Sequence, residues 1–277
     1  MNMSKRIIYV AAVCSVGVTA DAQTWHADPV SECTVFDDET DAQGVVVSWT
    51  GECSRNNRAE GTGILNWFED GALAGRYNGP MKAGKMHGAG VIYVAAKEGG
   101  YDRYEGEFKN SELSGQITAA GADGINFVGK FNSADSSGEG IITNAAGDEF
   151  TGKIANGKLT GQGHLILANG EQYRGVFQNN ELQGDEEWLG TNGDYYKGGF
   201  EAGEFSGKGR YEASDGAVYE GEFAAGLPEG EGRYTDPDGR ITAGAFVGGW
   251  PDGQVDITTP DGKTLSEFWT DGEREGD

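Results

Sequence analysis

The residues best suited to chemistry in this 277-residue chain are three histidines, three cysteines and many carboxylates. His26, His87 and His164 lie far apart in the sequence, whereas a Ser-His-Asp triad or a zinc site needs its members in one place. Acidic pairs within residues 185–187 (DEE) resemble the paired carboxylates of glycosidases, but 45 acidic residues produce such pairs by chance. We therefore predict no catalytic residue and no metal site, and hence no enzyme.

Two short motifs resemble ligand-binding loops. Residues 79–85 (GPMKAGK) fit the letters of a phosphate-binding loop, but Met86 follows where Ser or Thr would hold Mg²⁺. Residues 236–239 (DPDG) resemble part of a calcium loop, but Tyr234 and Ala245 stand where an EF-hand needs acidic ligands. We interpret both motifs as glycine-rich turns and predict no cofactor.

The charge balance excludes two classes of partner. The chain has 45 acidic and 21 basic residues and a net charge of −24. Nucleic acid and anionic lipid surfaces both require clustered Lys and Arg. We therefore expect neither nucleic-acid binding nor binding to anionic membranes, and we expect a protein partner whose identity the sequence does not define.

The first 22 residues have the organisation of a signal peptide. Lys5 and Arg6 precede an apolar run over residues 7–19, and Ala20-Asp21-Ala22 supplies the small-x-small pattern of a cleavage site. The apolar run is too short for a helix that crosses a bilayer, which needs about 20 residues. We expect cleavage near Ala22 and a protein that is exported, either periplasmic or secreted.

Cleavage would remove Cys14 and leave Cys33 and Cys53. A single remaining pair in an exported protein favours a disulfide. The bridge would close a loop of about 21 residues, which contributes roughly 3 kcal/mol in the chain-entropy model. The chain has no CxxC motif, and neither cysteine has a histidine at ligand spacing, so a metal pair has no support.

Internal repetition covers most of the chain. The pattern Tyr/Phe-x-Gly-x-Phe recurs every 23 residues from Tyr104 to Tyr219, continues in weaker form at Thr242, and appears upstream with insertions at Trp49 and Tyr77. The residues that define the repeat are Tyr104, Gly106, Phe108, Phe127, Gly129, Phe131, Phe150, Gly152, Tyr173, Gly175, Phe177, Tyr196, Gly198, Phe200, Tyr219, Gly221 and Phe223.

Each repeat is predicted to be two short strands. A Gly-x-Gly pair lies eleven and thirteen residues after the leading aromatic in most repeats, and Asn-Gly or Asp-Gly then supplies a hairpin turn. Alternation puts Tyr219 and Phe223 on one face and Glu220 and Glu222 on the other. One face is therefore aromatic and lined by glycine, which leaves room for rings from the neighbouring hairpin, and the other is acidic.

The pattern in residues 219–232, Tyr-x-Gly-x-Phe-x-x-Gly-x-x-x-Gly-x-Gly, resembles the MORN repeat, and the resemblance extends over about residues 49–264. With the leader and the two cysteines, the chain is similar to exported bacterial MORN-repeat proteins. The resemblance implies an all-β fold: an elongated, single-layer, twisted antiparallel sheet of tandem hairpins. It also implies scaffolding and dimerisation. The membrane association of some family members is not carried over, because this chain lacks a basic surface.

The expected organisation has four parts. Residues 1–22 form the signal peptide, 23–48 an N-terminal cap segment, 49–264 an array of about nine repeats, and 265–277 a partial repeat with an acidic tail. Three functions remain open. The favoured one is a non-enzymatic exported scaffold or protein-interaction module that binds through its concave aromatic face or a terminal sheet edge. The others are a carbohydrate- or cell-wall-binding protein with exposed aromatics, and a hydrolase with an unrecognised site.

The C-terminal end is a candidate for self-association. A linear array of hairpins has an unpaired sheet edge at each end. Phe268 and Trp269 are large apolar residues in the last, partial repeat. They would either cap the array or pair with a second copy across a two-fold axis, so a homodimer stays open.

Overall fold

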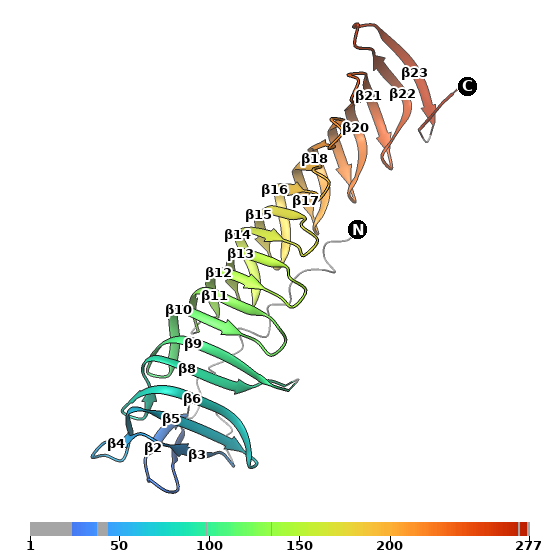
Figure 1. The fold of residues 1–277 in the computed structure, drawn as a ribbon. Coiled ribbons are helices and arrows are strands. Elements are labelled where there is room, and N and C mark those ends of the chain that lie inside the picture. The colour runs from blue at the N-terminus through green and yellow to red at the C-terminus, as the bar shows by residue number, and fades with distance from the viewer. Residues whose placement is uncertain (1–23, 38–43, 98, 134, 271, 276–277) are drawn as a thin grey trace. The chain divides into compact units, whose positions relative to one another are not determined.

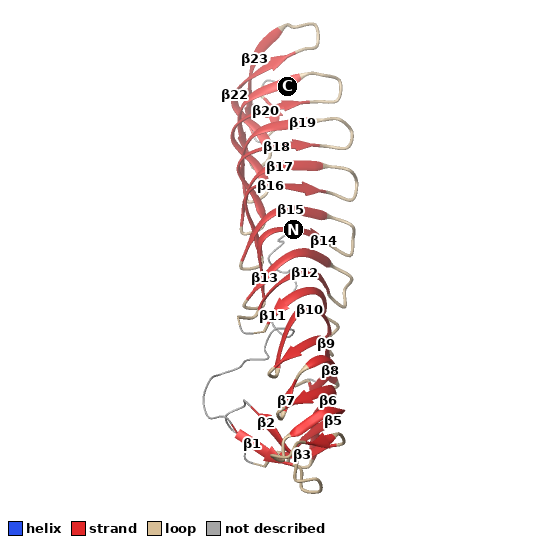
Figure 2. Cartoon of the chain, turned by 90° about the vertical axis from the view of Figure 1, so that its left-hand side faces the viewer, coloured by secondary structure: helices blue, strands red, loops and turns tan. Residues whose placement is uncertain are grey.

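The computed structural model describes residues 24–37, 44–97, 99–133, 135–270 and 272–275. These residues form strands joined by turns, and none of them is helical (Figures 1 and 2). The prediction of an all-β fold of tandem antiparallel hairpins is confirmed. The expected signal peptide, residues 1–22, lies outside the described residues. Over the described parts of the chain, there is no helix of the length and hydropathy that crossing a membrane requires.

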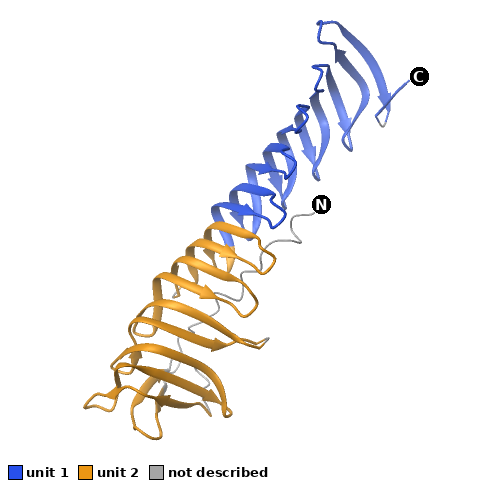
Figure 3. Ribbon diagram, viewed as in Figure 1, with its two compact units in different colours: residues 1–8, 159–277 blue, residues 9–158 orange. Residues whose placement is uncertain are grey.

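The chain divides into two compact units between Lys158 and Leu159 (Figure 3). The division falls inside the predicted repeat array. We call the described residues before it the N-terminal unit and those after it the C-terminal unit, and each is considered by itself.

The N-terminal unit begins with a separate two-stranded sheet, and the remaining strands then pair antiparallel. Its strands are β1 (Thr24–Ala27), β2 (Thr34–Asp37), β3 (Val46–Trp49), β4 (Glu52–Cys53), β5 (Ala59–Glu69), β6 (Ala72–Lys82), β7 (Lys85–Met86), β8 (Gly88–Ala95), β9 (Tyr101–Lys109), β10 (Glu112–Ala120), β11 (Asn126–Asn132), β12 (Ser137–Thr143) and β13 (Glu149–Ala155).

In the C-terminal unit each strand pairs with the one that follows it in the chain. Its strands are β14 (Lys158–Ile166), β15 (Gln172–Gln178), β16 (Glu181–Leu189), β17 (Tyr195–Glu201), β18 (Glu204–Glu212), β19 (Val218–Ala224), β20 (Leu227–Thr235), β21 (Ile241–Val247), β22 (Trp250–Thr258), β23 (Thr264–Thr270) and β24 (Glu273–Arg274).

Two kinds of turn alternate along the repeats. The Asn-Gly and Asp-Gly turns have positive φ only at glycine, for example +94° at Gly216. Here the side chain of Asp215 accepts a hydrogen bond from the N–H of Ala217, two residues on, at 2.9 Å. These turns are therefore Asx-stabilised loops, and they are not type I′ turns because Asp215 itself lacks a positive φ.

The tight two-residue turns lie at the other end of each hairpin, where the sequence had not indicated a turn. Ala225 and Gly226 join β19 to β20 with φ of +49° and +82°, which is the pattern of a type I′ turn. The N–H of Gly226 also donates to the carbonyl of Phe205 in the preceding repeat, at 3.0 Å. This bond recurs as Gly249 to Pro228 and holds successive hairpins together.

In several repeats the leading aromatic residue packs directly on the glycines of its own hairpin. A Cβ placed on Gly209 would lie 2.4 Å from the hydroxyl oxygen of Tyr196, and one on Gly232 would lie 2.2 Å from that of Tyr219. The expectation that the rings come from a neighbouring hairpin is therefore wrong. The reason is that Gly198 follows Tyr196 by two residues on the same strand and pairs in register with Gly209. The Tyr196 ring can therefore lie over both glycines.

The predicted division into an aromatic and an acidic face is present in the described repeats. The leading aromatics and following phenylalanines are buried, whereas Glu105, Glu107, Glu220 and Glu222 are exposed. The buried aromatic members are Tyr104, Phe108, Phe127, Phe131, Phe150, Tyr173, Phe177, Tyr196, Phe200, Tyr219 and Phe223. One layer of sheet thus places most of its apolar side chains on a single side.

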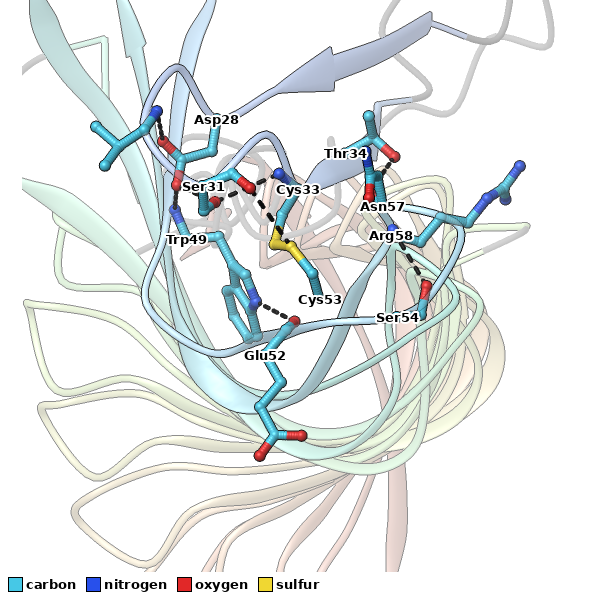
Figure 4. The surroundings of a disulfide bond; sticks show 11 residues. Asp28, Ser31, Cys33, Thr34, Trp49, Glu52, Cys53, Ser54, Asn57 and Arg58 are labelled. Carbon is cyan, nitrogen blue, oxygen red and sulfur yellow. Dashed lines mark hydrogen bonds between the residues drawn. A yellow bond between two sulfur atoms is a disulfide. The ribbon is translucent and has the colours of Figure 1, made fainter.

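A disulfide joins Cys33 to Cys53 in the N-terminal unit, with 5.6 Å between their Cα atoms (Figure 4). It fixes the segment between β1 and β2 to the edge of the sheet. Beside it, the buried carboxylate of Asp28 accepts hydrogen bonds from the N–H of Trp49 at 3.3 Å and the hydroxyl of Ser31 at 2.6 Å. Burial opposes ionisation of Asp28, but these hydrogen bonds outweigh it and lower its pKa.

Candidate functional site

The C-terminal unit has a groove of about 830 Å³ that is lined by residues of strands β15 to β23 and of the turns beside them. This volume lies within the range of ligand-binding sites in proteins. Ten aromatic residues line it: Tyr173, Trp188, Phe205, Tyr211, Tyr219, Phe223, Tyr234, Phe246, Trp250 and Trp269. We call this hollow the aromatic groove.

Five of the lining residues belong to a ladder of six aromatic residues on consecutive strands, and the sixth, Tyr196, is fully buried. Trp188 on β16 pairs in register with Tyr173 and with Tyr196, and Tyr219 on β19 pairs with Tyr211 and with Tyr234. Tyr196 and Tyr211 complete the series by pairing with each other. Six adjacent strands therefore present an aromatic side chain at the same level. Cross-strand aromatic pairs stabilise a sheet, so the ladder has a structural role as well.

Strand bends explain why the ladder lies in a groove. In β15, β17, β19 and β21 the pairing register shifts just after the repeat glycine, for example between Gly198 and Phe200. Residues 206–208 then stand opposite Gly199 alone. A bulge of this kind bends the strand, and four bends at the same repeat position align. In the N-terminal unit, β9 and β10 also pair with a register shift, whereas β11 and β12 pair without one.

Two tyrosines of the ladder, Tyr219 in the groove and the buried Tyr196, are held neutral and fixed. The hydroxyl of Tyr196 donates to the carbonyl of Gly199 at 2.9 Å, and that of Tyr219 donates to the carbonyl of Glu222 at 3.1 Å. Burial, followed by nearby carboxylates, raises the pKa of Tyr219 to about 12, and burial likewise raises the pKa of Tyr196. These hydroxyls are neutral at physiological pH and are engaged by the backbone.

Acidic residues stand along the groove. Glu171, Glu204 and Asp236 contribute to its lining, and Arg240 is the basic residue among the described lining residues. The hydroxyl of Tyr173 donates to the carboxylate of Glu171 at 3.0 Å. The C-terminal unit as a whole is acidic, because residues 159–277 include 24 acidic and 8 basic residues. A cationic ligand would therefore be attracted to this groove.

Two aromatic side chains of the groove are open to solvent. Tyr234 is 37% exposed and Trp250 is 62% exposed. Trp250 directly follows the turn at Gly248 and Gly249 and pairs with Val247. Because these two rings are accessible, they can contact a ligand without rearrangement of the core.

The structure separates the two C-terminal residues that the sequence analysis had grouped. Phe268 and Trp269 are neighbours on β23 and point to opposite faces of the sheet, as strand geometry requires. Trp269 lines the aromatic groove, whereas Phe268 is 53% exposed on the other face. They do not form one patch.

The candidate chemical motifs have structural explanations. The ammonium of Lys85, last residue of the phosphate-loop pattern, lies 3.7 Å from the centre of the Phe36 ring. The calcium-loop pattern is a turn in which the N–H of Gly239 donates to the carbonyl of Asp236 at 3.0 Å. Within the described ranges, no group of three or more His, Cys, Asp or Glu residues is arranged to hold a metal ion.

In the acidic run at residues 185–187, Glu186 and Glu187 interact with neighbouring strands. Lys197 forms an ion pair with Glu187 at 3.1 Å, and its hydrogen bond is the main reason that the pKa of Glu187 is lowered. The carboxylate of Glu186 accepts a hydrogen bond from the N–H of Val176 at 2.9 Å. Two of the three carboxylates of this run are therefore engaged by neighbouring groups.

The sequence analysis missed the second-strand residues that flank the groove. Phe205, Pro228 and Pro251 pair with Phe200, Phe223 and Phe246 of their own hairpins. The missed residues themselves lie 23 residues apart, and this period was the signal that could have identified them.

Comparison with known families supports the repeat interpretation. The sequence model of the MORN repeat matches residues 104–116, 150–172, 196–218 and 219–239. Three of these four segments lie wholly or partly in the C-terminal unit, and all three contribute residues to the aromatic groove. The fold and these matches together support a MORN-repeat protein. No curated protein matches the chain in sequence.

Three solved structures that the chain resembles share little sequence with it. The TCP domain of SAS-4 (dCPAP) from Drosophila melanogaster, solved in complex with a proline-rich motif of Ana2 (dSTIL), is 12% identical with a TM-score of 0.37, over 57% of this chain and 88% of that one. Virginiamycin B lyase from Staphylococcus aureus is 13% identical with a TM-score of 0.14, over 81% of this chain and 74% of that one. A streptogramin B lyase is 12% identical with a TM-score of 0.16, over 81% of this chain and 73% of that one. None of these scores is high enough to carry an argument about function.

Proposed function

We propose that the protein is a non-enzymatic, exported scaffold that binds another protein in the aromatic groove of its C-terminal unit. The observation that carries the proposal is the groove itself, with its aromatic floor and two solvent-accessible rings, Tyr234 and Trp250. Interfaces between proteins are enriched in Tyr and Trp, which bury large areas at little cost in side-chain entropy.

Export is part of the same proposal. The signal-peptide pattern of residues 1–22 supports it, as does the cysteine pair at Cys33 and Cys53, since disulfides persist in oxidising compartments. The partner would then be a periplasmic or extracellular protein. The negative charge makes nucleic acid and anionic membranes unsuitable partners.

The test is a crosslinking pull-down with the exported protein in its native host. Wild type is compared with a variant that carries Tyr234→Ala and Trp250→Ala. Phe268→Ala is the matched control, because Phe268 is an aromatic on the other face whose 53% exposure lies between those of Tyr234 and Trp250. We expect the double variant to lose partners that wild type and the control retain. Identical sets of partners for all three proteins would contradict the proposal.

A carbohydrate or cell-wall ligand is the second candidate, and the 62% exposure of Trp250 favours it, because an exposed ring can stack on a sugar. A glycan array would separate the two functions: binding of glycans that disappears with Trp250→Ala supports the carbohydrate function. A hydrolase is the third candidate. It has less support, because the acidic run at residues 185–187 is engaged in hydrogen bonds and an ion pair.

A further inference from the structure

We infer that the segment bound in the aromatic groove is a polyproline II helix, rich in proline and carrying Lys or Arg. The inference rests on the proposed function and specifies the chemistry of the partner. Three independent features support it: the spacing of the repeats, the donors in the groove, and the charge along it.

Repeat spacing is the first feature. Equivalent residues recur every 23 positions, which corresponds to two strands. Neighbouring strands lie about 4.8 Å apart, so equivalent sites along the groove recur about every 9.6 Å. A polyproline II helix has three residues per turn and a rise of 3.1 Å, so its equivalent side chains recur about every 9.3 Å.

The match can be followed along the whole groove. Between Tyr173 and Trp269 the groove extends over about four repeats, or about 38 Å on the strand spacing. Twelve residues of polyproline II cover about 37 Å, so each triplet would meet one repeat with little accumulated error. An α-helix repeats every 5.4 Å, and two of its turns exceed one repeat by about 1.2 Å. The side chains on one face of an extended strand recur about every 6.6 Å, so that conformation fits less well.

Hydrogen-bond donors are the second feature. Trp188, Tyr234 and Trp250 line the groove, and their indole N–H and hydroxyl groups donate to no other described residue. The strands beneath them are already paired on both sides, so a ligand has no sheet edge to join there. A polyproline II helix makes no internal hydrogen bonds and presents its carbonyl groups outward, where tryptophan and tyrosine donors can reach them.

Charge is the third feature. Glu171, Glu204 and Asp236 lie along the groove with a single basic neighbour, Arg240. Arg or Lys side chains on the ligand would complement these carboxylates, and they could also lie over the aromatic rings. A neutral or acidic proline-rich segment would lack this attraction.

The test uses the full exported chain and synthetic peptides, with binding measured by calorimetry. The first peptide has four Pro-Pro-Arg triplets, the second four Gly-Ser-Arg triplets, and the third four Pro-Pro-Glu triplets. We expect the Pro-Pro-Arg peptide to bind at least about tenfold more tightly than the Gly-Ser-Arg peptide, because it is ordered before binding. The Pro-Pro-Glu peptide should not bind. Equal affinity for both arginine peptides would show attraction by charge alone and would overturn the inference.

Variants locate the binding. Tyr234→Ala and Trp250→Ala should each weaken binding of the Pro-Pro-Arg peptide by about tenfold, as for an exposed aromatic contact at an interface, and Phe268→Ala should not change it. An equal loss with Phe268→Ala would contradict binding in the groove. If the groove variants lose their native partners in the pull-down while no proline peptide binds, the inference fails and the proposed function stands. If chitin or cellulose oligosaccharides bind and the peptides do not, both fail.

Discussion

The hydroxyl of Tyr211 donates a hydrogen bond to the carboxylate of Asp194, seventeen residues earlier and in the preceding repeat. The same carboxylate accepts a hydrogen bond from the backbone N–H of Ser214 at 2.8 Å. The side chain of Asp194 therefore connects the loop after β16 to the loop after β18 by hydrogen bonds. The hydrogen bond from Tyr211 is the main reason that the pKa of Asp194 falls to about 2.

Replacing Tyr211 with Phe removes this donor and leaves the ring in place. We expect a loss of about 1 kcal/mol in the free energy of unfolding near neutral pH. Because the folded pKa of Asp194 lies below its ordinary value of 3.8, the stabilisation is complete above about pH 4 and is lost as the pH falls toward 2. The free energies of unfolding of wild type and Tyr211→Phe, measured with urea, should therefore converge at low pH. A difference that does not depend on pH would contradict the role of the ionised carboxylate.

Replacing Gly209 with Ala should be strongly destabilising, because the new Cβ would lie 2.4 Å from the Tyr196 hydroxyl oxygen. We expect a loss of about 3 kcal/mol, as for an overpacked core position. Gly207→Ala is the control. It has open space around it but a φ of +65°, so only backbone strain of about 1 kcal/mol is expected. Thermal melts would show whether Gly209→Ala is the more destabilised variant. Equal losses of stability in the two variants would contradict the packing of Tyr196 on glycine.

Replacing both Cys33 and Cys53 with Ser should destabilise the N-terminal unit. The expected loss is about 3 kcal/mol, from the greater freedom of the unfolded chain. Thermal melts of the variant and of wild type with and without reductant would measure it. The peptide map of the wild-type protein should change when reductant is added, and a map that stays the same would exclude the bridge.

Cleavage of the exported protein should occur after Ala22, because the small-x-small pattern ends there. N-terminal sequencing should then begin at Gln23. A mature protein that begins at Met1, or one with a lipid on Cys14, would contradict this prediction.

Removing the chain after Gly262 should lower the melting temperature or cause aggregation. β23 pairs with β22 over residues 264–269, so its removal exposes the edge of β22 and takes Trp269 from the groove. Phe268→Ser, on the exposed face, should leave the melting temperature unchanged. If light scattering shows instead that wild type is a dimer and Phe268→Ser a monomer, the C-terminal strand is a dimer contact and not a cap.

The sequence by itself determined the hairpin repeat and the two faces of the sheet, because both depend on local periodicity. A strand period of two separates Tyr219 from Glu220 wherever the strand lies, and the 23-residue period repeats the same strand pair along the chain. The pairing of Cys33 with Cys53 could also be predicted, since only these two cysteines would remain if residues 1–22 were cleaved as a signal peptide.

Tertiary structure decided the tight turns, the groove and the surroundings of the terminal aromatics. Ala225 has no intrinsic preference for positive φ, and it adopts one because the pairing of β19 with β20 closes the turn around it. The groove depends on aligned bends in four strands, which follow from cross-strand register. The sequence places Phe268 and Trp269 side by side, but only the path of β23 against β22 determines which ring enters the groove and which meets solvent.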